Sequence, residues 1–242
     1  KGFIFDGVGL CASFGNEIDQ NNAILFINSK LGIILLSAIA PTLSLTSGDF
    51  LKLPFLIQPL DNNLQSESLI SISKYDWDSY ENSWNFSCLP LISLKNINMT
   101  LEKNYKSIRS SWEKMILNTK MMEEKNNQIY IDTYGLNQYL TSEVPLREIS
   151  LTCNPSYRYG EKISKEIQEK RLQSDTIKEF ISYSVGCMFG RYSLEESGLI
   201  LVNQGETLEN YLKKIPKPSF LPDDDNVIPV LDLDWFEDDI TA

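Results

Sequence analysis

The chain has 242 residues, 42% of them apolar and none of them histidine, and its 33 acidic and 22 basic side chains give a formal net charge of −11. Without histidine the chain has no Ser-His-Asp or Cys-His relay, no histidine metal ligand and no histidine proton shuttle. The charge argues against a general nucleic-acid binder, which would be basic, but residues 201–242 alone carry three basic and ten acidic side chains, a net of −7, so that the first 200 residues carry the remaining −4.

Residues 1–60 predict a small α/β module. Its first 20 residues contain several glycines and favour a short strand and turns. Residues 22–40 are apolar on nearly all sides, which at this length predicts a buried helix. That helix would have its cap near Asn21 or Asn22 and would stop at Pro41.

After this helix the pattern becomes typical of strands and loops. Residues 42–57 alternate apolar and polar around a Gly-Asp turn, which predicts strand, turn, strand. Residues 60–73 are rich in Asn and Ser and predict a loop or linker. Residues 75–86 predict a helix that docks by aromatic side chains on one face, or alternatively a base-stacking platform. That face would hold Trp77, Tyr80 and Trp84.

Residues 97–131 show the clearest periodicity of the chain. Apolar side chains recur there at steps of three, four or seven, which predicts an amphipathic helix of roughly 30 residues. We interpret this helix as a strut or spacer. Its polar face carries Lys103, Lys106 and Arg109, which are either solvated partners of nearby glutamates or phosphate contacts.

The last part of the chain predicts further helices. Residues 147–153 favour a strand, and two helices follow at about 161–173 and 176–191. A capping box of Thr176 and Glu179 would begin the second of these helices. Its predicted packing face holds Ile177, Phe180, Ile181, Ser184, Val185, Met188 and Phe189.

Together these elements predict an α+β chain that is predominantly helical and has three parts. They are the α/β module of residues 1–60, a helical spacer of residues 61–145, and a helical C-terminal region of residues 146–242 with an acidic tail. The tail carboxylates do not have the spacing of an EF-hand loop. We therefore expect a solvated tail, or one that docks on a basic surface.

The four cysteines are far apart, which argues against a zinc site, and we expect no metal. They are typical of buried small hydrophobic residues in a reducing compartment, so we expect a cytoplasmic protein. The longest apolar run, residues 31–41, is too short to span a bilayer, so no membrane partner is expected. The chain begins inside an apolar run without Met or a signal-peptide layout, as a fragment of a longer protein would.

One motif has a catalytic counterpart. Asn154-Pro155-Ser156-Tyr157 is similar to the Asn-Pro-Pro-Tyr loop of amino-group DNA methyltransferases, which accepts hydrogen bonds from the target amino group and stacks on the flipped base. Here Ser156 replaces the second proline, and no glycine-rich cofactor loop precedes the motif, since Gly7-Val8-Gly9 lacks a following helix. The preferred interpretation is a turn in which Tyr157 and Tyr159 pack locally.

Longer stretches resemble known families. Residues 22–55, with Asn28-Ser29-Lys30 and a Gly-Asp-x-x-x-Leu-Pro exit, resemble the closing segment of target-recognition domains in DNA methyltransferases and specificity proteins. Residues 153–160, 180–200 and 225–240 resemble the C-terminal half of PglX-like adenine-specific DNA methyltransferases of BREX phage-exclusion systems. This second resemblance covers nearly the whole chain.

PglX-like proteins carry their cofactor and Asn-Pro-Pro-Tyr motifs in a domain N-terminal to this region. The resemblance therefore implies no catalytic or cofactor-binding residue in this chain, and S-adenosylmethionine as the cofactor of the parent enzyme. It implies duplex DNA as the parent's partner, with this chain contributing target recognition and spacing. The candidate DNA contacts are Lys30, Lys52, Lys103, Lys106 and Arg109.

Two alternatives stay open. In the first, the chain is a protein-interaction module that docks other BREX proteins or phage inhibitors through residues 75–86 and the acidic tail. In the second, it is a self-contained methyltransferase that uses residues 154–157. Binding measured at several salt concentrations distinguishes DNA contacts from an apolar protein interface, because only DNA contacts weaken steeply with ionic strength.

Overall fold

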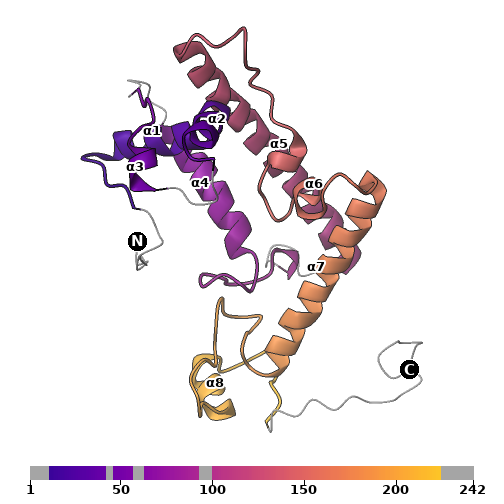
Figure 1. Cartoon of the computed structure of the whole chain (residues 1–242). Helices are drawn as coiled ribbons and strands as arrows, with labels where there is room; N and C mark the ends of the chain where they lie inside the picture. The colour runs from indigo at the N-terminus through magenta and orange to yellow at the C-terminus, as the bar shows by residue number, and fades with distance from the viewer. Residues whose placement is uncertain (1–10, 42–45, 57–62, 93–99, 225–242) are drawn as a thin grey trace. The chain divides into compact units, whose positions relative to one another are not determined.

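The computed structural model describes residues 11–41, 46–56, 63–92 and 100–224. The regular elements among these residues are helices, and none of these residues forms a strand (Figure 1). The predicted predominance of helix is confirmed, whereas the predicted α/β character of the N-terminal module is not supported. The elements are α1 (Glu17–Ile27), α2 (Lys30–Ile39), α3 (Ser47–Phe50), α4 (Asn63–Asp78), η1 (Pro90–Ile92), α5 (Leu101–Thr133), η3 (Leu146–Glu148), α6 (Pro155–Tyr159), α7 (Lys165–Met188) and α8 (Leu208–Lys214).

The described residues divide into two compact units. The first unit takes those of Lys1–Trp77 and Arg109–Gln168, and the second takes those of Asp78–Ile108 and Glu169–Ala242. Helices α5 and α7 therefore contribute to both units. The functional division at residues 60 and 145 stays a prediction.

The predicted apolar helix of residues 22–40 is two helices, α1 and α2, bent by 75°. The cap of α1 is Asn16, whose side chain accepts from the Asp19 amide, so the predicted caps lie inside the helix. Ser29 separates the helices because its hydroxyl donates to the Phe26 carbonyl at 2.6 Å and accepts from the Gly32 amide at 3.0 Å, which begins α2. Helix α2 ends just before Pro41, as predicted.

The predicted strand, turn and strand of residues 42–57 is wrong where the structure describes it. Residues 47–50 form α3, a single turn of helix. Thr46 and Asp49 make a capping box: the Thr46 side chain accepts from the Asp49 amide, and the Asp49 carboxylate accepts from the Thr46 amide. Local capping therefore favours a helical turn over the hairpin that the alternation predicted. Residues 42–45 and 57 lie outside the described part.

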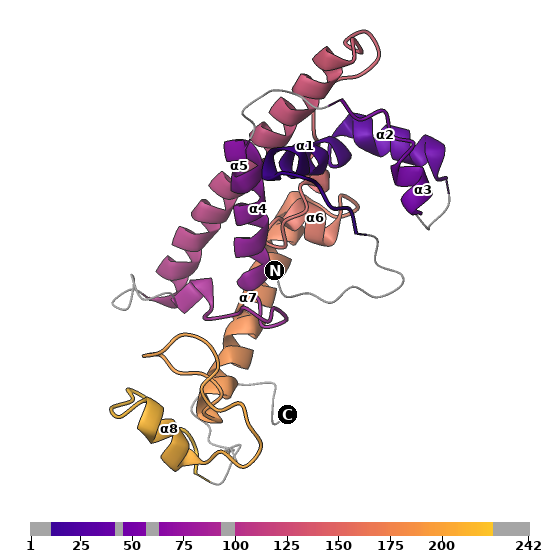
Figure 2. The ribbon, with the colours of Figure 1, turned by 90° about the vertical axis from the view of Figure 1, so that its left-hand side faces the viewer.

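The predicted loop of residues 60–73 is helical from residue 63, because α4 runs to Asp78. Figure 2 shows α4 beside α5, and the Gln65 side chain donates to the Met122 carbonyl of α5 at 2.7 Å. The prediction failed because a polar composition does not exclude a helix that tertiary contacts hold in place.

The predicted aromatic docking helix of residues 75–86 is also wrong. Helix α4 ends at Asp78, and the exposed fractions are 59% for Trp77 and 99% for Trp84. Phe86 is the aromatic residue of this segment that enters a core.

The core of the first unit forms where α1 meets α5. Leu25, Phe26, Leu31 and Tyr130 are buried together. The Phe26 and Tyr130 rings meet edge to face at 5.3 Å between centroids, and the Tyr130 hydroxyl donates to the Asn22 carbonyl at 3.0 Å. The long helix itself is confirmed, since α5 has 33 residues.

The predicted strand of residues 147–153 is wrong, although its alternation is real. Ile149, Leu151 and Cys153 are buried in alternation, as on one face of a strand. No strand among the described residues pairs with this backbone. The buried Asp76 carboxylate instead accepts from the amides of Thr152 at 2.6 Å and Cys153 at 3.1 Å. A side chain thus satisfies amides that a neighbouring strand would otherwise bind.

The two predicted helices at 161–173 and 176–191 are one helix, α7. Thr176 is not a cap, because it lies inside α7 and its hydroxyl donates to the Leu172 carbonyl at 2.8 Å. The predicted packing face is also rotated: Tyr183 and Cys187 enter the core, while Ile181 is 56% exposed. A helix that is apolar on several sides does not specify which face its partners cover.

The core of the second unit is a cluster with aromatic residues from α7, from the loop after it and from the loop after α4. The Tyr183 and Tyr192 rings stack at 4.8 Å between centroids, and Phe86 meets both edge to face. Gly186 leaves room for the Tyr192 ring, since a Cβ there would lie 2.6 Å from Cδ2. Gly190 has φ of 69°, which ends the turn after α7.

Candidate functional site

Of the predicted DNA contacts, Lys30, Lys52 and Arg109 belong to the first unit. The Lys30 ammonium donates to the carbonyls of Thr141 at 2.8 Å and Glu143 at 2.9 Å. Its side chain therefore ties α2 to the segment after α5 and has one further N–H to donate.

Lys52 and Arg109 differ in exposure. The Lys52 side chain is 65% exposed and pairs with Asp49 at 3.0 Å. The hydrogen bond from the Thr46 hydroxyl, and next the one from Lys52, lower the pKa of the Asp49 carboxyl to about 2. Arg109 is half-buried on α5, and its charge acts on the buried Cys153 thiol.

Lys103 and Lys106 lie on the first turns of α5, in the second unit. Both are exposed, and the Lys106 ammonium pairs with Glu102 one turn earlier. This ion pair lowers the pKa of the Glu102 carboxyl. The interpretation of a solvated face therefore describes Lys106 well, while phosphate contact stays a prediction for all five basic residues.

The motif that is similar to a methyltransferase loop has a structural role. Asn154 is 2% exposed and caps α6 by accepting from the Ser156 amide at 3.2 Å. Its side-chain amide donates to the carbonyls of Leu146 at 2.7 Å and Ile149 at 2.8 Å. The Asn154 side chain is thus engaged inside its own loop, as expected of a turn former, whereas Tyr157 is 49% exposed instead of packed.

The cysteines give no activated nucleophile among the described residues. Cys153 and Cys187 are buried as predicted, Cys88 is half-buried and Cys11 is exposed, and all four are free. Burial, and next the Asp76 carboxylate, raise the pKa of the Cys153 thiol far above its usual range. Burial likewise raises the pKa of the Cys187 thiol to about 11. Both thiols are therefore protonated at neutral pH.

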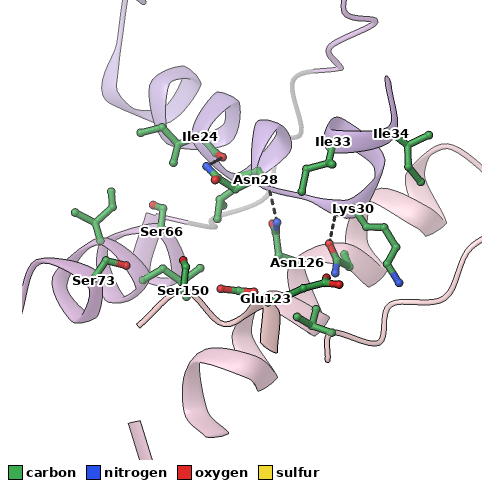
Figure 3. A pocket seen from close by; sticks show the side chains of 16 residues that line it. Ile24, Asn28, Lys30, Ile33, Ile34, Ser66, Ser73, Glu123, Asn126 and Ser150 are labelled. Carbon is green, nitrogen blue, oxygen red and sulfur yellow. Dashed lines mark hydrogen bonds between the residues drawn. The ribbon is translucent and has the colours of Figure 1, made fainter. Parts of the chain in front are cut away.

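The first unit contains a cavity of about 560 Å³ that the sequence did not predict. Figure 3 shows Ser66 and Ser73 of α4 on one side of it, Lys30 and Ile33 of α2 on the other, and Glu123 of α5 between them. The lining residues are Ile24, Leu25, Asn28, Lys30, Ile33, Ile34, Ser66, Leu69, Ile70, Ser73, Glu123, Asn126, Asn127, Val144, Glu148 and Ser150.

Two asparagines of α5 organise this cavity. Asn127 accepts from the Lys30 amide at 2.8 Å and donates to the Ser142 carbonyl at 3.2 Å. Asn126 is 3% exposed and donates to the Leu25 carbonyl at 2.8 Å, whereas its Oδ1 is buried without a hydrogen-bond partner. In the sequence, the one signal that could have pointed to this cavity is the pair of asparagines on the buried side of an amphipathic helix.

Glu123 is the chemically unusual group of the cavity. Burial, and next the charge of Glu148, raise the pKa of the Glu123 carboxyl from 4.5 to about 7. Two carboxyl groups thus face one partly apolar space, and near neutral pH only part of the Glu123 population is ionised.

Among the residues that the structure describes, no group of three His, Cys, Asp or Glu side chains has the arrangement of a metal site. None of the described helices has by itself the length and apolarity to cross a bilayer. Helices α1 and α2, taken together as a bent pair, do have that length and apolarity.

No family model matches the chain. The chain is 34% identical over 247 residues to the adenine-specific methyltransferase BrxX of Escherichia coli O9:H4 (strain HS), a match that covers 100% of the chain and 20% of that protein. It is 31% identical over 242 residues to the adenine-specific methyltransferase PglX of Lacticaseibacillus casei (strain Zhang), covering 98% of the chain and 18% of that protein. The chain thus spans about a fifth of the length of the curated relatives it matches.

Proposed function

Because the chain is PglX-like over its whole length, we propose that it is a non-catalytic part of an adenine-specific DNA methyltransferase that acts in phage defence. The observation that carries this proposal is the match, over nearly all of this chain, to two proteins named adenine-specific methyltransferases. The engaged side chain of Asn154 supports it, because this Asn would have to leave its own loop to bind a flipped base.

In this proposal the parent enzyme transfers a methyl group from S-adenosylmethionine to the adenine amino group. The cofactor and the flipped base are held by parts of the enzyme outside this chain. The chain contributes target recognition and spacing, in the cytoplasm. Helix α5 supports the spacing role, since 33 residues of continuous helix extend about 50 Å at 1.5 Å per residue.

The DNA contacts in this proposal are phosphate contacts, which position a protein on the duplex. Lys52, Lys103 and Lys106 are the most exposed of the five candidates. Lys30 keeps one N–H beyond its two carbonyl bonds, and Arg109 is half-buried. We therefore expect the three exposed lysines to contribute most of the salt-dependent affinity.

The test is binding of the chain to a fluorescent DNA duplex, measured by anisotropy at several salt concentrations. One variant carries alanine at Lys30, Lys52, Lys103, Lys106 and Arg109. A control variant carries alanine at Lys162, Lys165, Lys170, Lys213 and Lys217, which are exposed lysines elsewhere. Both variants lose the same charge, so a difference between them reports local contacts and not net charge.

We expect the first variant to bind more weakly and with a shallower salt dependence, because each lost phosphate contact lowers the slope of log K against log salt by about 0.9. The control should bind like the unmodified chain apart from a small uniform loss. Equal weakening of both variants, or no salt-dependent binding by the unmodified chain, would contradict the assignment of these residues.

A second candidate function is docking of other defence proteins or phage inhibitors. The observation in its favour is the exposure of Trp77 and Trp84, which the sequence led us to expect in packed positions. Large aromatic residues are typical anchors of protein interfaces. Trp84→Ala would weaken such docking by a similar factor at low and at high salt. It would leave the slope of log K against log salt for DNA binding unchanged.

A further inference from the structure

Apart from Lys30, the residues that line the cavity of the first unit have no part in the proposed DNA role. Its volume of about 560 Å³ lies within the range of small-molecule sites, about 300 to 1,000 Å³. Apolar walls come from three helices, with Ile33 on α2, Leu69 on α4 and Leu25 on α1, and Val144 adds to them from the segment after α5. Such walls suit an aliphatic body.

One buried acceptor at the cavity lacks a partner. Asn126 is 3% exposed, and its Oδ1 has no hydrogen-bond donor within the described residues. A buried acceptor without a donor is unfavourable, so a hydrogen bond from a ligand would stabilise it. The carboxyl groups of Glu123 and of Glu148, which also pairs with Arg147 at 3.8 Å, line the same cavity and are acceptors as well.

The charged groups that line the cavity are Lys30, Glu123 and Glu148. The Lys30 ammonium is directed to the carbonyls of Thr141 and Glu143. The lining therefore has an excess of negative charge once Glu123 ionises, which favours cations over anions.

We propose that this cavity binds a small organic cation with an aliphatic body and a hydrogen-bond-donating head, of the alkylguanidinium or alkylammonium class. The head would donate to the Glu123 carboxylate and to Asn126 Oδ1, and the aliphatic body would pack against the apolar walls. A guanidinium has five N–H donors in one plane and therefore satisfies several acceptors together.

The test is isothermal titration calorimetry of the chain with butylguanidinium chloride at about pH 8, where Glu123 is mostly ionised. Butylurea, which has a similar shape and no charge, is the comparison ligand. Glu123→Gln removes the charge with little change in size. Glu113→Gln is the matched control, because Glu113 is exposed on the same helix and does not line the cavity.

We expect saturable binding of butylguanidinium that Glu123→Gln weakens about tenfold, and that Glu113→Gln leaves within about twofold of the unmodified chain. Butylurea should bind at least about tenfold more weakly than butylguanidinium and should not respond to Glu123→Gln. Ser73→Phe, which places a ring at the cavity wall without a change in charge, should abolish binding of butylguanidinium.

Three results would overturn the proposal: no saturable heat with butylguanidinium, equal affinity for the charged and the neutral ligand, or equal effects of Glu123→Gln and Glu113→Gln. A circular dichroism spectrum of each variant checks that its helices are retained. None of these results depends on DNA binding, so the proposal stands or falls separately from the proposed function.

Discussion

Replacing Asn154 by alanine tests whether this residue supports the fold or belongs to a latent catalytic loop. The side chain makes three hydrogen bonds, two as donor to the carbonyls of Leu146 and Ile149 and one as acceptor from the Ser156 amide. The lost cap costs about 1 kcal/mol. Each carbonyl left without its donor costs about 1 kcal/mol. We therefore expect Asn154→Ala to destabilise this region by about 3 kcal/mol.

The assay is native-state hydrogen exchange by mass spectrometry, because it reports the local opening of residues 146–160 even if the two units unfold separately. A loss of about 3 kcal/mol corresponds to a decrease in protection of roughly a hundredfold. Ser156→Ala is the matched control, since it removes a neighbouring side chain and keeps the amide that donates to Asn154. Its protection should change by less than about threefold.

The reasoning would be refuted if Asn154→Ala exchanged like the unmodified chain. It would also be refuted if the control lost as much protection as Asn154→Ala, because the loss would then not come from the three bonds of Asn154.

Three further predictions concern the packing at Gly186, the charge of Glu123 and the binding of S-adenosylmethionine. Gly186→Ala should lower the midpoint of thermal unfolding by about 5 °C, because its Cβ would lie 2.6 Å from the Tyr192 ring, whereas Gly48→Ala, with space at its Cβ, should change it little. The raised pKa of Glu123 means that the folded chain binds more protons than the unfolded chain between pH 4.5 and about 7, so stability falls as pH rises through that window. The midpoint of thermal unfolding of Glu123→Gln should therefore exceed that of the unmodified chain by more at about pH 8 than at about pH 4. Calorimetry with S-adenosylmethionine should give no binding to this chain, and saturable binding would instead favour a methyltransferase that uses residues 154–157.

Local patterns predicted the long helix well and the shorter elements poorly. The period of α5 extends over many turns, so its apolar stripe is unambiguous. The segment of residues 147–153 has the alternation of a strand, yet its amides bind Asp76 from α4 instead of a neighbouring strand. Nothing in the local sequence shows that a carboxylate some 76 residues earlier in the chain takes that place.

The cavity was missed for a related reason. Glu123 and Asn126 come from α5 and Lys30 from α2, and their chemistry arises only where these helices meet. A glutamate on an amphipathic helix is normally solvated, and the raised pKa of Glu123 follows from burial and from the proximity of Glu148. Of these features the sequence contained one hint, the Asn126-Asn127 pair on the buried side of α5.

By itself the sequence determined which chemistry is excluded, because a chain without histidine has no imidazole in any fold. It also determined the resemblance to PglX-like proteins, since that depends on residue identity along the chain and not on contacts. Only the tertiary structure decided which face of α7 is buried, which polar side chains are engaged, and that Asn154 binds its own loop. The physical reason is that burial and hydrogen bonding depend on partners distant in sequence, and periodicity carries no information about those partners.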